Sequence, residues 1–288
     1  MRRAAPAGGY ADLHLHTVAS DGTQTVGEVV ARAKAAALSA IAITDHDAVS
    51  RDLVGRSNRI NGVEVITGVE LKTDFDGVSG ELLAYFIEPN HPELLELLAS
   101  MERARVTRME RMVAKCRDAG IDLDMSDVRN HAKGNVGRPH LARALKEKGA
   151  IDELDEAFIR FIGRGQPCYV PLEKVSLREA VRVLRAAGAA ISVAHPCLMR
   201  VADWDPFFSL LAEAGVDALE SVYPYRDPRS ADLSISPELL AAQAAKHGFL
   251  TSGGSDDHGL GSTKVSLGQV RLSYEHVEAL KERARAPL

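Results

Sequence analysis

The sequence predicts an α/β fold in which β/α units form a parallel sheet or barrel, interrupted by an inserted helical domain. Three observations lead to this prediction. Short apolar runs alternate with helical patterns from Tyr10 onward, which is typical of β/α units. One long internal stretch has an almost wholly helical pattern, and side chains that can bind metal ions follow most of the apolar runs.

The first β/α unit begins at residue 10. Apolar and polar residues alternate over 11–16, so His14 and His16 fall on the same face of one strand. After a glycine-containing loop, Thr25 and Glu28 form a capping box. Apolar residues then recur at helical spacing, so we expect a helix there.

The same alternation predicts the later strands. They are expected at 40–44, 64–67, 82–87, 189–194, 218–222 and 249–252. Between 92 and 170 the pattern is helical instead, with one long helix. We therefore expect a barrel domain formed by 10–91 and 171–288, and an inserted helical domain at 92–170 that covers the active site.

The composition limits the class of protein. A chain of 288 residues that is 45% hydrophobic can form one large core, or a core and a small second domain. The net charge of -5 argues against an overall electrostatic attraction to nucleic acid, although a local basic pocket could hold phosphate. The three cysteines do not form a metal or disulfide pattern. Because no apolar stretch is long enough to span a membrane and no signal peptide is recognisable, we expect a cytoplasmic protein without membrane contact.

Potential metal ligands lie at the ends of most of the expected strands. They are His14, His16, His46, Glu70, His195, Asp256 and His258. The carboxyl ends of parallel barrel strands form one face, so these side chains should converge in space. Imidazole and carboxylate groups suit zinc, manganese or iron. The sequence therefore predicts a metal site on this face of the barrel.

Packing is the alternative explanation for each of these residues. A single histidine in a strand is more often a hydrogen-bonded core residue than a ligand. The pair His14 and His16 argues otherwise, because two imidazoles on one buried face are costly to desolvate unless something binds them. Asp21 could stabilise the turn before Gly22, or it could reach the same cluster.

The motifs around these residues resemble those of a known family. They are DLHLH at 12–16, SDG at 20–22, TDHD at 44–47, GVE at 68–70, AHP at 194–196 and GSDDH at 254–258. This ordered set, which covers residues 10 to 260, is similar to the polymerase and histidinol phosphatase (PHP) superfamily. The resemblance implies a distorted barrel of seven β/α units that binds two or three divalent ions.

The resemblance also implies which residues bind each ion. His14, His16, Glu70 and Asp256 would bind the first ion, and Asp21, His46 and His258 the second. Glu70 would also bridge to a third ion near His195. At one position the chain departs from the family, whose members usually have histidine in a His-Leu-Leu-Gly stretch where this chain has Glu81. Glutamate can still bind a hard ion such as manganese, but the third site could be weakened or lost.

The expected helical domain carries the candidate substrate-binding residues. Its segment 137–140 resembles small phosphoesterases of the superfamily that act on nucleotides, including nucleoside 3',5'-bisphosphate phosphatases and 5'-3' exoribonucleases. Arg138 and His140 are therefore candidates for binding phosphate, with a helix cap and a surface charge as the alternative readings. Arg105 and Arg108 belong to a charged run that is usually a solvated helix face, although their spacing also resembles the family pattern, which implies a role in phosphate binding.

The function expected from these residues is hydrolysis of a small phosphomonoester. The expected substrate is a nucleotide, such as a nucleoside 3',5'-bisphosphate or a 5'-mononucleotide, or a short oligonucleotide. A hydroxide that bridges two ions would attack the phosphorus. Two alternatives remain open. One is a metal-dependent amide or lactone hydrolase, and the other is a metal-binding regulatory module that has lost catalysis. The sequence does not indicate an oligomeric state.

Overall fold

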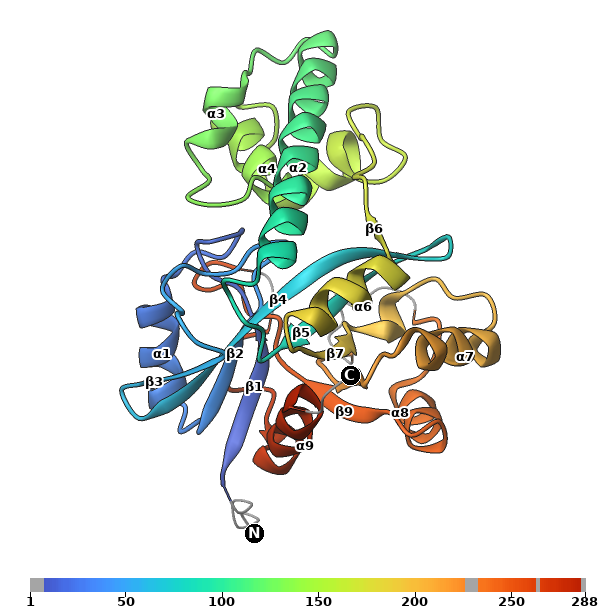
Figure 1. Ribbon diagram of the computed structural model, residues 1–288. Helices are drawn as coiled ribbons and strands as arrows, with labels where there is room; N and C mark the ends of the chain where they lie inside the picture. Colours follow the sequence, from blue (N-terminus) through green and yellow to red (C-terminus); the bar gives the residue numbers. More distant parts are fainter. Residues whose placement is uncertain (1–7, 226–232, 263–264, 286–288) are drawn as a thin grey trace.

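The computed structural model describes residues 8–225, 233–262 and 265–285. Over these ranges a ten-stranded sheet is accompanied by helices (Figure 1). The strands are β1 (Tyr10–Leu15), β2 (Ala40–Ile43), β3 (Ser57–Ile60), β4 (Val63–Phe75), β5 (Val78–Tyr85), β6 (Val175–Ser176), β7 (Ala190–Val193), β8 (Ala218–Val222), β9 (Leu250–Gly253) and β10 (Leu272–Ser273).

The helices fall into two sets along the chain. Those adjoining the strands are α1 (Val26–Ala35), α6 (Leu177–Ala186), η2 (Pro196–Leu198), α7 (Trp204–Ala214), α8 (Pro237–Lys246) and α9 (Tyr274–Arg285). Between β5 and β6 lie α2 (Pro92–Asp118), α3 (Met125–Arg129), α4 (Arg138–Glu147), α5 (Leu154–Ala157) and the π-helix η1 (Phe158–Ile162). Among the described helices, none is both long enough and apolar enough to cross a membrane.

The strands form a nearly closed, barrel-like sheet, which confirms the predicted fold class. Their order is β10-β1-β2-β4-β5-β7-β8-β9, and β3 and β6 pair with β4 outside this path. A parallel bridge between Leu15 and Asp257 brings the chain beyond β9 back to β1. The segments that carry the first and last sequence motifs are therefore neighbours in space.

The expectation of parallel strands does not hold in the middle of the sheet. Strand β5 is antiparallel to both of its neighbours, β4 and β7. The reason is a tight hairpin at Asp76 and Gly77, whose φ angles of +50° and +95° suit a two-residue β-turn. Strand β4 is also longer than predicted, so Glu70 lies within it, and Glu81 lies inside β5 rather than at its start.

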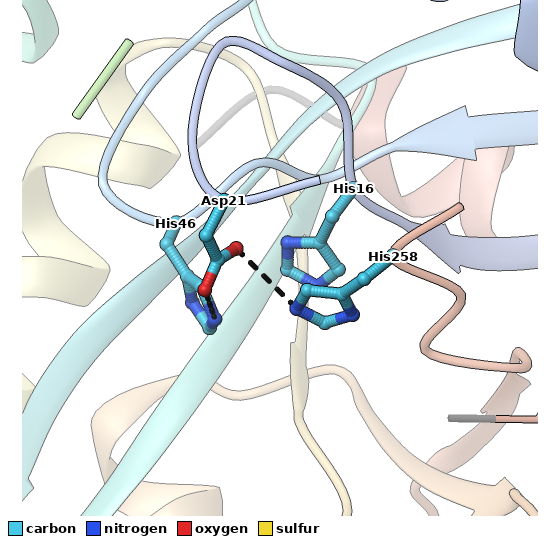
Figure 2. A group of neighbouring side chains, drawn as sticks. All are labelled: His16, Asp21, His46 and His258. Carbon is cyan, nitrogen blue, oxygen red and sulfur yellow. Dashed lines mark ion pairs between the residues drawn. The ribbon is translucent and has the colours of Figure 1, made fainter. Parts of the chain in front are cut away.

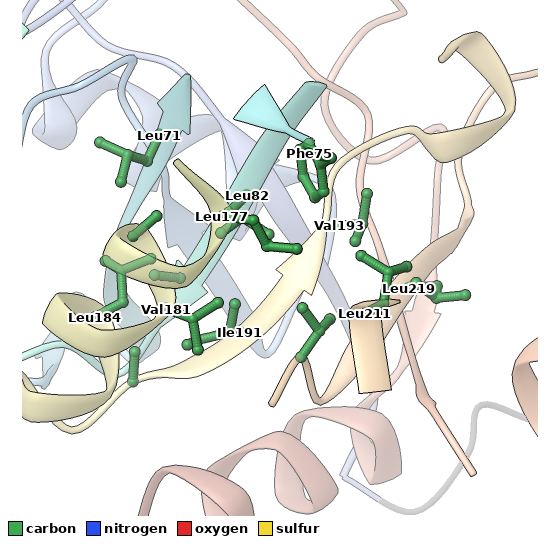
Figure 3. Close-up of a cluster of buried hydrophobic side chains, with 14 of the residues drawn as sticks. Leu71, Phe75, Leu82, Leu177, Val181, Leu184, Ile191, Val193, Leu211 and Leu219 are labelled. Carbon is green, nitrogen blue, oxygen red and sulfur yellow. The ribbon is translucent and has the colours of Figure 1, made fainter. Parts of the chain in front are cut away.

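Strand residues alternate between two apolar clusters. On the outer face of the sheet, side chains of β4, β5, β7 and β8 pack against helices α6 and α7 (Figure 3). Neighbouring residues of opposite parity, such as Leu83 and Ala218, join a second cluster with Val277 and Leu280 of α9. Glu81 lies two residues before Leu83 in β5, and Glu220 lies two residues after Ala218 in β8, so each lies on the same face as that neighbour. The face that α9 covers at one end is thus polar farther along.

Helices α2 to α5 and η1 stand to one side of the sheet (Figure 1). They have an apolar cluster of their own, which includes Met112, Leu141 and Leu145. The first turns of α2 belong instead to the barrel cluster, through residues such as Leu94 and Leu98. Helix α2 therefore joins the cluster of the helical segment to the barrel cluster. Packing of its first turns on the barrel determines where its later turns lie relative to the sheet.

Candidate metal centre

The structure brings all nine predicted ligands into one cluster. These are His14, His16, Asp21, His46, Glu70, Glu81, His195, Asp256 and His258. Four overlapping groups have ligand atoms within 4.8 Å of one another: His16, Asp21, His46 and His258; His14, His195 and Asp256; His14, His16 and Glu70; and His46, Glu70 and Glu81. Figure 2 shows the first group, in which Asp21 faces both His46 and His258. We call this set the histidine–carboxylate cluster.

Glu70 is central to the histidine–carboxylate cluster. Its Oε2 atom lies 2.8 Å from Nδ1 of His46 and 3.4 Å from Nε2 of His16. Its Oε1 atom lies 3.1 Å from Nε2 of His195 and 3.4 Å from Nε2 of His14. One carboxylate thus contacts four imidazoles, which is the position expected of a bridging group.

Asp256 is close to three of the same rings. Its Oδ1 atom lies 3.3 Å from Nε2 of His16, 3.6 Å from Nε2 of His14 and 3.6 Å from Nδ1 of His258. Gly254 makes this approach possible, because a Cβ atom there would lie 2.4 Å from the backbone nitrogen of His14. The glycine in the last motif therefore allows the end of β9 to pack directly against β1.

Several buried polar atoms of the histidine–carboxylate cluster have no hydrogen-bond partner within the described part of the chain. They are Nε2 of His14, both ring nitrogens of His16, Nδ1 of His46 and Oε2 of Glu70. His46 and Glu70 are within ion-pair distance, but the direction of that contact does not meet hydrogen-bond geometry. Buried polar atoms without partners are costly, and a cation between them would remove that cost. The donor set therefore fits divalent metal ions.

The electrostatics of the cluster favour cation binding. Burial, and then the nearby rings of His258 and His46, lower the pKa of His16 to about 3. Burial acts to raise the pKa of Glu70, but His46 and His14 outweigh it and hold that pKa well below its usual value. The neutral imidazole and the ionised carboxylate are the forms that bind metal. Burial acts to lower the pKa of His46, but Glu70 and Asp21 raise it to about 10, so this position attracts positive charge.

Two groups that the sequence reasoning missed orient the cluster. One carboxylate oxygen of Glu220 lies 2.9 Å from Nδ1 of His14, and the other accepts a hydrogen bond from the backbone nitrogen of His195. The hydroxyl of Tyr223 donates to Oδ2 of Asp256 at 2.9 Å. Groups of this kind fix the ring and carboxylate orientation of metal ligands. The sequence did contain a signal for Glu220, because a carboxylate in the middle of an apolar strand indicates a buried polar role.

Three arginines of the helical segment form a second group, which we call the arginine group: Arg105, Arg108 and Arg138. The alternative of a solvated face is wrong for Arg105, which is 9% exposed and donates from Nε to Asp47 at 2.6 Å. Arg138 lies over the rings of Phe158 and Tyr169, at 5.5 and 6.0 Å from their centroids. Burial lowers the pKa of Arg138 below its ordinary value, although Tyr169 and Glu81 act to raise it. The arginine group and the histidine–carboxylate cluster therefore interact electrostatically.

His140 is buried at the start of α4. Its Nδ1 atom accepts a hydrogen bond from the backbone nitrogen of Gly137 at 3.0 Å, so this atom serves as a helix cap. Burial lowers the pKa of His140 to about 4, in spite of the nearby negative charge of Asp21. The ring is therefore neutral at physiological pH.

Comparison with known proteins identifies the family. Residues 12–123 match the PHP domain. The chain is 31% identical to the 5'-3' exoribonuclease Rnm of Escherichia coli, over 86% of this chain and 84% of that protein. It is 30% identical to the 3',5'-nucleoside bisphosphate phosphatase of Chromobacterium violaceum, over 89% of this chain and 90% of that protein.

A solved structure agrees with these relatives. The crystal structure of a protein from Bifidobacterium adolescentis, described as a metal-dependent phosphoesterase, superposes with a TM-score of 0.82 at 27% identity. The match covers 95% of this chain and 96% of that one. All three proteins are named for phosphoester hydrolysis, and the present chain has side-chain groups that could hold metal ions. The chain belongs to the PHP family and is a metal-dependent phosphoesterase.

Proposed function

We propose that the protein hydrolyses a phosphomonoester of a nucleotide, with at least two divalent ions in the histidine–carboxylate cluster. The observation that carries the proposal is the convergence of buried ring nitrogens without partners on Glu70 and Asp256. Such an arrangement is unfavourable unless cations lie between the groups. Two neighbouring ions are also the arrangement that suits displacement at phosphorus.

The ligands divide into two sets. We propose that His14, His16, Glu70 and Asp256 bind the first ion, and that Asp21, His46 and His258 bind the second. The short distances of Glu70 to both sets support a bridging role. Imidazoles and carboxylates together suit manganese, zinc or iron. His195 and Glu81 form the remaining part of the cluster.

Other residues of the chain would orient the metal ligands and bind phosphate. Bound ions would activate a water molecule and withdraw charge from the phosphoryl oxygens. Glu220 holds the ring of His14, and Tyr223 holds the carboxylate of Asp256, so that their ligand atoms keep one orientation. The arginine group offers hydrogen-bond donors to phosphate oxygens beside the cluster, and the planar guanidinium of Arg138 can form two parallel hydrogen bonds.

A nucleotide with two phosphates is the substrate that fits both groups. The cluster would take the scissile phosphate, and Arg138 would hold the second phosphate, with the helical segment 92–170 covering it. The two curated relatives support this choice, since both are named for activity on nucleotides or RNA. A cavity of about 900 Å³ borders Thr17 and Asp47, which directly follow two proposed ligands in the chain. No proposed metal ligand lines that cavity, so we assign it to the remainder of the substrate rather than to the reacting phosphate.

A phosphate-release assay tests the proposal. The protein would be stripped of metal, loaded with Mn²⁺ and given nucleoside 3',5'-bisphosphates, mononucleotides, short oligonucleotides and sugar phosphates. We expect release to require the metal and to be fastest with a nucleotide. Preference for a sugar phosphate over every nucleotide would contradict the substrate assignment. Amine release from an amide, without phosphate release, would favour the amide hydrolase alternative.

A further inference from the structure

Lys72 is a cation already in place at the edge of the histidine–carboxylate cluster. It lies two residues after Glu70 on β4 and is paired with Glu81 of β5 across the hairpin. Its Nζ atom lies 2.8 Å from Oε1 of Glu81. The lysine side chain is 29% exposed and the glutamate 12%, so solvent screens this ion pair only in part.

Glu81 differs in this respect from the other proposed ligands. Its carboxylate lies 3.5 Å from Nε2 of His195 and 3.8 Å from Nδ1 of His46, so it could complete a third metal group with Glu70. The unpartnered atoms include Nδ1 of His46 and Oε2 of Glu70, which also belong to this third group, but Glu81 itself already faces an ammonium group. The carboxylate of Glu81 therefore has a cation without a third metal ion.

The backbone around Lys72 is also held in place. Its backbone nitrogen donates to Oδ1 of Asp47 at 2.8 Å, and Oδ2 of the same carboxylate accepts from Arg105. Asp47 itself follows the ligand His46 in the chain and adopts a left-handed backbone with φ of +48°. These contacts fix the strand from which the lysine reaches Glu81.

We infer that the ammonium group of Lys72 takes the place of a third divalent ion at Glu81, so that the centre binds two ions. The inference rests on the proposed function. An ammonium group and a divalent ion that both contact the carboxylate of Glu81 would lie only a few ångströms apart and would repel each other strongly. Lys72 instead supplies a fixed positive charge on the side of the cluster that contains His195 and Glu81.

The ion count of a lysine variant tests this inference. Metal-free protein would be titrated with Mn²⁺ by calorimetry, and bound manganese counted by elemental analysis. We expect two ions per chain in the native protein and three in Lys72→Met, because Glu81 is then free to bind. The double variant Lys72→Met with Glu81→Gln should return to two. Lys146→Met is the matched control, since it removes a surface lysine from a similar pair with Glu153 and should leave the count at two.

Anomalous diffraction at the manganese edge would locate the added ion. The inference requires it beside Glu81, and an added ion elsewhere would overturn the inference. Three ions in the native protein, or two in a folded Lys72→Met variant, would also overturn it. If Lys72→Met does not fold, Glu81→Gln in the native background decides instead: it should keep two ions, and a lower count would identify Glu81 as a ligand. Fewer than two ions in the native protein, with no phosphate release, would contradict the proposed function itself.

Discussion

The histidine–carboxylate cluster is largely buried and the arginine group is partly buried, and the two favour ligands of opposite charge. In the cluster, several imidazole nitrogens and Oε2 of Glu70 have no hydrogen-bond partner within the described residues, which favours cations. In the arginine group, burial lowers the pKa of Arg108 to about 10 with further lowering from Arg138 and Arg105, which favours an anion. A complex of metal ions with a phosphate satisfies both. In the proposed function, the cluster would supply the chemistry and the arginine group the selectivity.

Loss of a central ligand should have the largest effect on this arrangement. Asp256→Ala removes the carboxylate that contacts three rings, so bound metal and phosphate release should disappear together. The loss of several kcal/mol of transition-state stabilisation corresponds to roughly a thousandfold or more in kcat. Elemental analysis and a phosphate assay measure the two quantities. Circular dichroism should show a folded chain, and His131→Ala, on the surface of the helical segment, should keep both metal and activity.

The buried histidine of the helical segment should make stability depend on pH. The folded chain holds the pKa of His140 at about 4, below the ordinary 6.5, so the unfolded chain binds more protons between these values. Stability is therefore fully present above pH 6.5 and decreases as the pH falls towards 4, by up to roughly 3 kcal/mol. Urea unfolding of metal-free native protein and His140→Gln measures this difference. Glutamine can accept the same Gly137 hydrogen bond, so parallel pH profiles for the two proteins would contradict the assignment.

Arg138→Ala should separate the two groups kinetically. A hydrogen bond to a charged group contributes about 1.5 to 3 kcal/mol, so kcat/KM for a nucleoside bisphosphate should fall roughly ten- to a hundredfold. The loss should be far smaller for an aryl phosphate, which lacks the second phosphate. Equal losses on both substrates would mean that Arg138 acts on the scissile phosphate or on folding. No loss on either would return it to a structural role at the start of α4.

Tyr223→Phe should have the smallest effect. It removes one hydrogen bond to Asp256 but keeps the ring that packs against His195. The acceptor is a carboxylate that is itself a proposed metal ligand, so loss of the group that orients it should weaken Mn²⁺ binding roughly tenfold, at the low end of the usual range. Calorimetric titration measures the affinity. An unchanged dissociation constant would show that Asp256 keeps its orientation without the tyrosine.

The two groups also differ in how far the sequence could predict them. The alternation in β1 placed His14 and His16 on one face, and the ordered motifs indicated the rest of the cluster. Glu220 escaped notice because its contact with His14 joins residues 206 positions apart, which no local pattern reveals. Burial of Arg105 likewise depends on Asp47, which lies 58 positions earlier in the chain. Local periodicity predicts faces and elements, whereas these contacts arise only when the sheet closes.

The antiparallel hairpin shows the same limit in the fold. A short parallel strand was expected at 64–67. In the structure β4 continues to Phe75, and its residues up to Leu71 are buried on both faces of the sheet. A continuous apolar run does not show where a buried strand ends. The Asp76-Gly77 turn was the available local signal, and it explains why Glu70 and Glu81 come from adjacent antiparallel strands.

Crystals of the native protein grown with Mn²⁺ and inorganic phosphate would test the central claim most directly. Anomalous scattering at the manganese edge should give one peak among His14, His16, Glu70 and Asp256, and a second among Asp21, His46 and His258. Phosphate should lie between these ions and the arginine group. Phosphate bound at the arginine group with no manganese in the cluster, or manganese bound away from these residues, would contradict the claim that the cluster is the catalytic metal centre.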